Sequence, residues 1–205
     1  MSIHPIATVA GVPVWPGIVD AAEARLRSSR AAAALPAGGT SEGRQLRRWL
    51  TQLIVTERVV AAEAAARGLS GRTAPSEAAL LPDVTARLEI GSVAAAALAD
   101  PLARALFADV TAAVRVADAE VVAYHARNPM RFAASRQGQG GWCTTALEAP
   151  PLDEVRPAIE AHLRGAARRR AFRLWLDARR AALVELSPGY EHPGDPRQPD
   201  NTHRH

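Results

Sequence analysis

The spacing of apolar residues along this chain is mainly helical. Between residues 42 and 67 they recur every three or four positions, as on one face of an α-helix, at Leu46, Trp49, Leu50, Leu53, Val60, Ala61 and Ala64. A second long helix is predicted over 153–183, with Pro157 in its first turn, where proline is tolerated. Shorter helices are predicted over 20–34, 83–99, 101–113 and 119–127, and Asp20 and Asp118 are placed to cap the first and last of these.

Strand signals are few and short. Residues 6–14 read as a β-like run around a glycine turn, and Pro13 predicts a position at a sheet edge, because proline cannot donate a ladder hydrogen bond. Residues 184–186 could add a further short strand. The pattern therefore predicts an all-α fold with at most one short β pair, in which the long C-terminal helix packs on the N-terminal helices.

Glycine and proline divide the chain into four parts. We expect an N-terminal helical region over 1–131 and a Gly-rich loop over 132–152. A C-terminal helix over 153–186 would complete the same domain, and a Pro- and His-rich tail would follow over 187–205.

Composition favours closely packed helices and argues against several classes of protein. Hydrophobic residues make up 48% of the chain and aromatic residues only 4%. Much of the hydrophobic fraction is alanine, the residue that most favours helix formation. The net charge is +4 and the positive charge is carried by arginine. These arginines are spread through helices without interleaved aromatic residues, so nucleic-acid binding is not expected. The single cysteine, Cys143, excludes an intramolecular disulfide and a thiolate zinc site within one chain.

The chain also lacks the features that direct a protein to or across a membrane. Residues 1–10 show no basic segment followed by a long apolar run, and no stretch reaches the roughly 20 apolar residues of a membrane span. We therefore expect a cytoplasmic protein. The sequence leaves its oligomeric state open, including a homodimer.

Three segments together resemble the SurA-type parvulin family of peptidyl-prolyl isomerases. The run Val9-Ala-Gly-Val-Pro-Val14, followed by the helix from Leu50 to Leu69, looks like the start of the family's chaperone module. Residues 116–128 look like the segment that leads into its isomerase domain, and 152–159 with 170–177 look like the helix that returns from it.

This resemblance implies a helical chaperone module without the parvulin catalytic domain. Between Phe132 and Pro151 the family would hold that domain, and here there is only a Gly-rich loop. The implied function is to hold an extended apolar peptide or acyl chain, without prolyl isomerase activity. If the family's pairing of chain ends carries over, helices 153–183 and 42–67 dock and form an apolar groove, lined by Trp49, Leu53, Phe172 and Trp175. The two tryptophans are also typical core anchors.

An enzymatic alternative rests on a few side chains. Cys143 follows a glycine-rich run and could be a nucleophile, although no histidine adjacent in the sequence activates it. It could also be an incidental small residue in a loop. His125 could be an acid or base, with Tyr124 beside it in sequence but on another helix face. The arginines at 168–170 could dock an acyl carrier protein, whose acyl or polyene chain would undergo double-bond isomerisation, as in polyketide biosynthesis, or they could form a solvated helix face.

The C-terminal tail carries metal-ligand residue types without a fixed spacing. His192, His203 and His205 lie among carboxylates and could bind a divalent ion, the only cofactor that the sequence suggests. The same tail could instead fold back over the groove or remain disordered.

Overall fold

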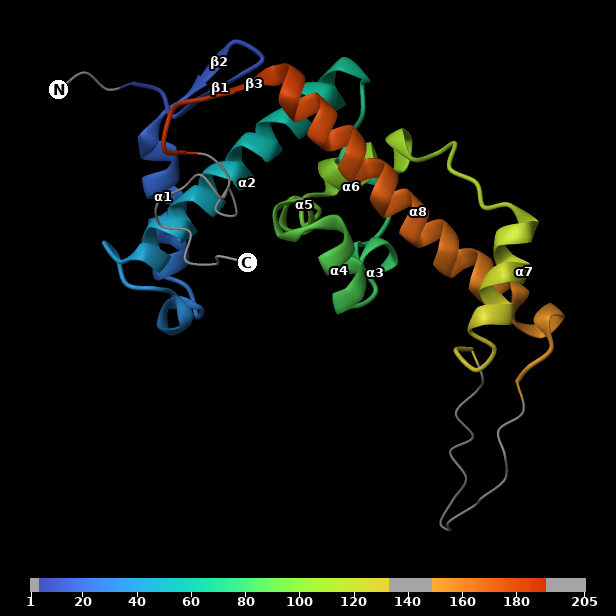
Figure 1. Ribbon diagram of the computed structural model, residues 1–205. Coiled ribbons are helices and arrows are strands. Elements are labelled where there is room, and N and C mark those ends of the chain that lie inside the picture. Colours follow the sequence, from blue (N-terminus) through green and yellow to red (C-terminus); the bar gives the residue numbers. More distant parts are fainter. Residues whose placement is uncertain (1–3, 133–148, 191–205) are drawn as a thin grey trace.

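The computed structural model describes residues 4–132 and 149–190 (Figure 1). Within these ranges the chain is mainly helical, as the sequence predicts. The helices are α1 (Pro16–Arg27), α2 (Ser41–Ala66), α3 (Glu77–Leu80), α4 (Val84–Ile90), α5 (Ser92–Ala97), α6 (Pro101–Val110), α7 (Asp118–Arg127) and α8 (Leu152–Leu183). The strands are β1 (Ala7–Val9), β2 (Val12–Val14) and β3 (Val184–Leu186).

The strands form one small antiparallel sheet in the order β2-β1-β3. The prediction of at most one short β pair is therefore wrong, because β3 follows α8 and pairs with β1, with Val184 opposite Val9. Pro13 lies on the edge strand β2, as expected from its missing N–H. The sheet thus joins the first and last described elements and fixes where α8 ends.

Helix α1 begins earlier than the sequence predicts. Pro16 takes the first helical position, where its fixed φ and missing N–H are favourable, so Asp20 lies inside the helix and does not cap it. Asp20 instead pairs with Arg47 of α2 at 2.6 Å. The helix then ends at Arg27, and residues 32–34 form a short 3-10 turn in place of its predicted last turns.

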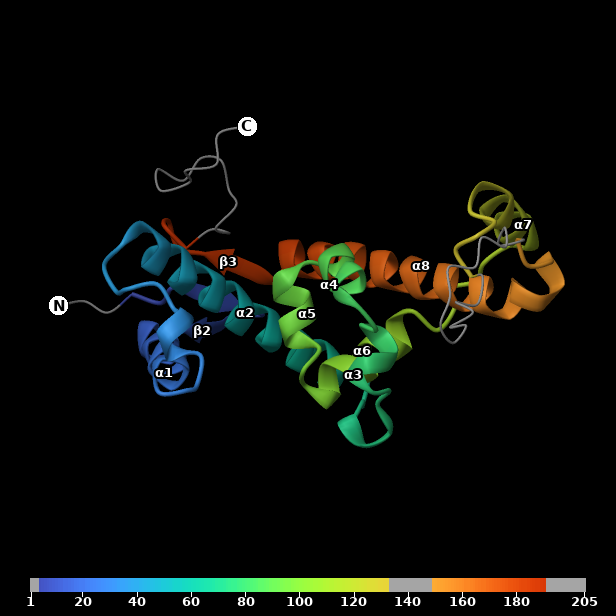
Figure 2. The ribbon, with the colours of Figure 1, turned by 90° about the horizontal axis from the view of Figure 1, so that it is seen from below.

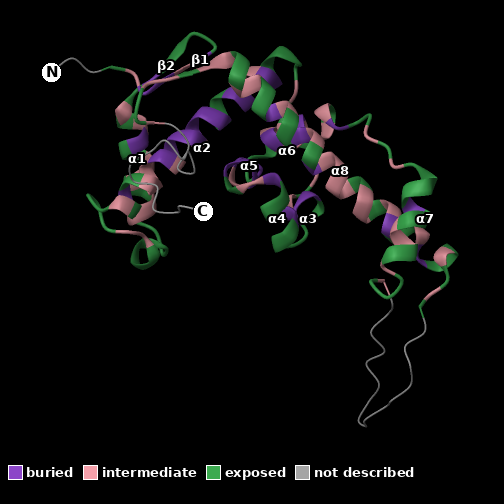
Figure 3. Ribbon diagram, viewed as in Figure 1, coloured by how far each residue is buried: buried purple, intermediate pink, exposed green. Residues whose placement is uncertain are grey.

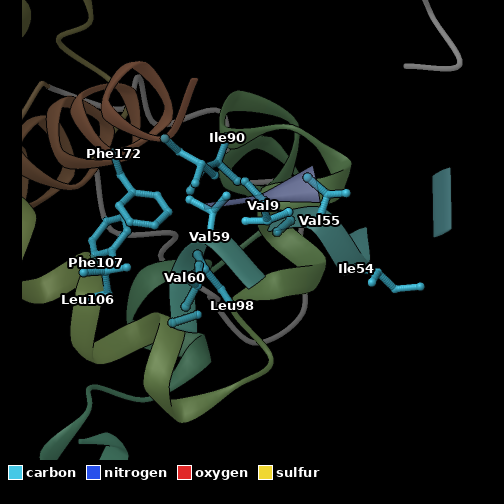
Figure 4. Close-up of a cluster of buried hydrophobic side chains, with 14 of the residues drawn as sticks. Val9, Ile54, Val55, Val59, Val60, Ile90, Leu98, Leu106, Phe107 and Phe172 are labelled. Carbon is cyan, nitrogen blue, oxygen red and sulfur yellow. The ribbon is translucent and has the colours of Figure 1, made fainter. Parts of the chain in front are cut away.

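Helix α2 is the central element of the core. The Thr40 hydroxyl accepts the Gly43 N–H at 3.0 Å and so caps its start, while Gly68, with φ of 63°, follows its last turn. Its buried residues meet α5, α6 and α8 in one cluster, and buried positions concentrate along it (Figures 3 and 4). Within this cluster the Phe107 ring of α6 meets the Phe172 ring of α8, with their centroids 5.0 Å apart.

The single helix predicted over 83–99 is wrong, because Gly91 divides it into α4 and α5. Gly91 has φ of 89° and ψ of 150°, a conformation that only glycine adopts without strain. Asp83 caps α4 through a 2.7 Å hydrogen bond from the Ala86 N–H. The break turns α4 away from α5, so that α4 can lie along α8 (Figure 2).

We expect Gly91→Ala to destabilise the protein by about 1–3 kcal/mol, because alanine is strained in this backbone conformation. Gly17→Ala is the matched control, since Gly17 lies in α1 and no other described segment comes within 4 Å of the place that an alanine Cβ would take. Alanine there should be neutral or stabilising by about 0.5 kcal/mol. Urea unfolding of the two variants measures the difference, and equal stabilities would contradict the assignment of strain to Gly91.

The long helix α8 packs against two separate sets of residues. Its C-terminal half docks on α2, as the sequence predicts, and contributes Phe172 and Leu176 to the main core. Its N-terminal half extends away from that core and packs with α7, where Val121, Val155 and Ile159 form a second, smaller cluster (Figure 2). Ala117, rather than Asp118, is the N-cap residue of α7, and its N–H donates to the Glu120 carboxylate at 2.8 Å.

Candidate functional site

A pocket of about 100 Å³ lies between α4 and the N-terminal half of α8. It is lined from α4 and the residues before it, from α8, and from the segment after α7. The side chains that give it polar character are Asp83, Glu89, Arg131, His162 and Arg169. Three separate segments of the chain therefore supply its chemistry.

His162 of α8 lines the pocket and also packs against the rings of Tyr124 and Phe132, which we call the aromatic wall. Its ring centroid lies 5.5 Å from that of Tyr124 and 5.9 Å from that of Phe132. Burial lowers the pKa of His162 below its ordinary value of 6.5, and the charges of Arg131 and Arg169 lower it further, against the opposing effect of Glu89 and Asp83. The imidazole is therefore neutral at neutral pH and can both donate and accept a hydrogen bond.

Arg169 forms the floor of the pocket and holds α4 against α8. It is only 6% exposed, its Nε donates to the Glu89 carboxylate at 2.8 Å, and its Nη1 donates to the Leu80 carbonyl at 3.3 Å. Gly165, one turn earlier, leaves room for this guanidinium, because a Cβ there would lie 3.2 Å from Nη1. The charge of Arg169 is thus neutralised within the protein.

Arg131 and Asp83 carry the remaining charges. Arg131 is exposed, and in the described part of the chain its guanidinium has no ion-pair or hydrogen-bond partner. The Asp83 carboxylate accepts the helix-capping N–H of Ala86 and pairs with no cation among residues 4–132 and 149–190. Both groups can contact a molecule that enters the pocket.

Two large aliphatic side chains on α4, outside the pocket lining, are exposed. Val84 is 70% exposed and Leu88 is 76% exposed, and they lie one turn apart on α4. Each is followed directly by a pocket-lining residue, Thr85 or Glu89, which lies about 100° further around the helix. We call Val84 and Leu88 the α4 ridge, and it lies on a different face of α4 from the residues that line the pocket.

The predicted catalytic residues are only partly brought together. Tyr124 lies in the aromatic wall beside His162, while the His125 Nε2 atom is 3.0 Å from the Pro150 carbonyl oxygen and so links α7 to the start of α8. Cys143 lies outside the described residues. The structure thus places Tyr124, but not His125, next to the pocket.

The four residues predicted to line a groove are located mainly in and around the main core. Phe172 is 1% exposed, and Trp175 stacks on it with centroids 5.7 Å apart while Arg67 lies over the indole ring. Trp49 is half-buried and donates from its indole Nε1 to the Ser92 hydroxyl at 3.2 Å, and Leu53 is also half-buried. Phe172 is therefore a core residue, because α6 covers it with Phe107.

The arginine run on α8 is largely used for internal contacts. Arg168 donates to the Thr111 hydroxyl at 2.8 Å and lies over the Phe107 ring, and Arg169 pairs with Glu89. Only Arg170 of the three is exposed. This follows from helical geometry, since three consecutive residues point about 100° apart and cannot share one surface.

The predicted metal ligands His192, His203 and His205 also lie outside the described residues. Among residues 4–132 and 149–190, no group of three or more His, Cys, Asp or Glu side chains is arranged to hold a metal ion.

The sequence interpretation missed Asp83, Glu89, Arg131, Arg169 and His162 as members of one site. One signal was available, because Gly165 is three residues and Arg169 seven residues after His162, which places all three on one face of the predicted helix. The contributions of α4 and Arg131 had no comparable signal, because they depend on how α4 and α7 pack against α8.

Comparison with known proteins gives one partial match. The model of a family of unknown function, DUF7158, matches residues 5–42, which cover β1, β2, α1 and the first residues of α2. No match was found among curated proteins or among solved structures. Within the described residues, no helix combines the length and the apolar character needed to cross a membrane.

Proposed function

We propose that this protein is a binding protein with a chaperone-like role, which holds an extended apolar chain against α4. The observation that carries this proposal is the α4 ridge, where Val84 and Leu88 are 70% and 76% exposed on a helix from which other residues line a pocket with hydrogen-bonding groups. Large aliphatic side chains this exposed, on adjacent turns of one helix, lose unfavourable contact with water when a partner covers them.

The dimensions of the ridge suit an extended chain. Residues four apart in a helix are separated by about 6 Å along its axis. Two residues of an extended polypeptide span about 6.6 Å. Apolar side chains at alternate positions of such a chain can therefore pack one on Val84 and one on Leu88.

The strength of this contact should be modest. Covering a valine or leucine side chain fully contributes about 1.5–3 kcal/mol, so two of them contribute roughly 4 kcal/mol before the cost of ordering the chain. A free energy of this size corresponds to a dissociation constant of about 1 mM for a single contact. Weak, reversible contacts of this kind suit a protein that retains and releases unfolded segments.

The resemblance to SurA-type foldases extends this proposal. Helix α8 docks on α2, as that resemblance implies, and the family would hold its isomerase domain where this chain has the segment 133–148. We therefore propose the chaperone module without prolyl isomerase activity.

Replacing Leu88 with serine tests this function. The variant should lose at least half of the protein's ability to suppress aggregation of a chemically denatured client, because it removes the more exposed side chain of the α4 ridge. Its unfolding free energy should change by no more than about 0.5 kcal/mol, as for other exposed positions. Leu174→Ser is the matched control, since Leu174 is also exposed, at 56%, but lies on α8 and is not part of the α4 ridge. Equal protection by both variants would refute the proposal.

One observation favours an enzymatic alternative, in which the chain is an acyl group delivered by a carrier protein. A neutral His162 beside an exposed Arg131 could remove a proton next to a carbonyl whose oxygen the guanidinium contacts. This alternative predicts that the protein converts a carrier-bound unsaturated acyl chain. It also predicts that His162→Gln abolishes the conversion.

A further inference from the structure

The charges around the pocket cancel. Asp83 and Glu89 contribute two negative charges, and Arg131 and Arg169 contribute two positive charges. Glu89 and Arg169 already neutralise each other at 2.8 Å, which leaves Asp83 and Arg131 to face a ligand with opposite signs. His162 adds no charge at neutral pH, because burial lowers its pKa.

A charged ligand group gains little in such a pocket. A carboxylate would be attracted to Arg131 and repelled by Asp83, whereas an ammonium group would be attracted to Asp83 and repelled by Arg131. Either charged group would also lose hydration on entering the pocket. A neutral group with one hydrogen-bond acceptor and one donor loses much less hydration. Its carbonyl can accept from Arg131, and its N–H can donate to Asp83 or to an acceptor nitrogen of His162.

We infer that the pocket recognises an uncharged peptide group within an internal segment of the bound chain, and that it disfavours the charged ends of a chain. This inference rests on the proposed function and names its ligand class as polypeptide. The aromatic wall of Tyr124 and Phe132 supports it, because both rings pack against the His162 ring, with centroids 5.5 and 5.9 Å from its own, and so restrict its orientation.

Three forms of one tetrapeptide, with leucine at its first and third positions, provide the test. One form has both ends blocked by acetyl and amide groups, one has a free carboxylate, and one has a free amine. NMR titration of the isotope-labelled full-length chain at pH 7.5 gives the affinities and the residues that respond. We expect the blocked form to bind about tenfold more tightly than either charged form, with shifts in α4 and around His162.

Two variants identify the group responsible. Arg131→Met keeps an unbranched apolar stem but removes the guanidinium and its donors, and it should weaken binding of the blocked peptide about tenfold, as expected for loss of a hydrogen bond from a charged donor. Arg170→Met removes an exposed arginine outside the pocket lining and should leave binding unchanged. Arg131 is exposed and its guanidinium has no hydrogen-bond or ion-pair partner in the described part of the chain, so its replacement leaves the fold intact.

The outcomes separate this inference from the proposed function. Equal affinity of the three peptides, a preference for a charged end, no binding of any of them, or an unchanged affinity of Arg131→Met would each overturn the inference. If Leu88→Ser still lowers protection of the client in that case, the proposed function stands without it. If Leu88→Ser has no effect either, both fail.

Discussion

Replacing Phe172 with alanine should destabilise the protein by about 3–5 kcal/mol, the largest effect that we expect from a single apolar substitution here. The ring is 1% exposed and is enclosed by Phe107 and Trp175, with centroids at 5.0 and 5.7 Å. Alanine would leave a cavity between α2, α6 and α8 that these helices can close only in part. Denaturant unfolding followed by circular dichroism measures the loss.

The matched control lies two residues further along the same helix. Leu174 is 56% exposed, so Leu174→Ala should change stability by no more than about 0.5 kcal/mol. A loss below about 1 kcal/mol for Phe172→Ala would mean that Phe172 lines an open groove, as the sequence alone suggested, and is not part of a closed core.

Replacing Glu63 with glutamine should cost about 2–3 kcal/mol at pH 7. Glu63 is buried on α2, accepts a 2.6 Å hydrogen bond from the Arg179 Nε of α8, and also pairs with Arg67. Arg67 in turn pairs with Asp109 of α6 at 3.3 Å, so the carboxylate links three helices. Breaking a fully buried pair costs about 3–5 kcal/mol, and the partial exposure of both arginines reduces that figure.

The effect of Glu63→Gln should also depend on pH. Burial by itself would raise the pKa of Glu63, but the hydrogen bonds and charges of Arg67 and Arg179 outweigh burial and hold this pKa below its ordinary value of 4.5. Because the folded-state pKa is the lower one, the carboxylate stabilises the protein fully above about pH 5. This contribution is lost as the pH falls through the folded-state pKa.

Unfolding free energies measured from about pH 7 down to about pH 3 check this expectation. The difference between the unsubstituted protein and Glu63→Gln should shrink with falling pH, whereas Glu185→Gln, at an exposed position in β3, should show a small difference throughout. A difference for Glu63→Gln that stays constant over the whole range would contradict the assignment.

The candidate site could be predicted from the sequence only in part. Tyr124 was identified as a candidate and does lie beside His162, but it was selected for catalysis next to His125, which instead contacts the Pro150 carbonyl. Val84 and Leu88 read as ordinary apolar positions of a helix, and periodicity cannot reveal that no other described element covers them. The pocket needed Asp83, Arg131 and His162 to be adjacent, although 79 residues separate the first from the last.

By itself the sequence determined the elements whose signals are local. The spacing of apolar residues placed α2 and α8 to within one or two residues, and Pro13 assigned β2 to an edge, because helical period and the missing proline N–H act within a few residues. Tertiary structure decided the rest. It buried Phe172 under Phe107, turned α4 away from α5 at Gly91, and left the α4 ridge uncovered. The physical reason is that a helix presents several faces to its surroundings, and which face is covered depends on segments distant in the chain.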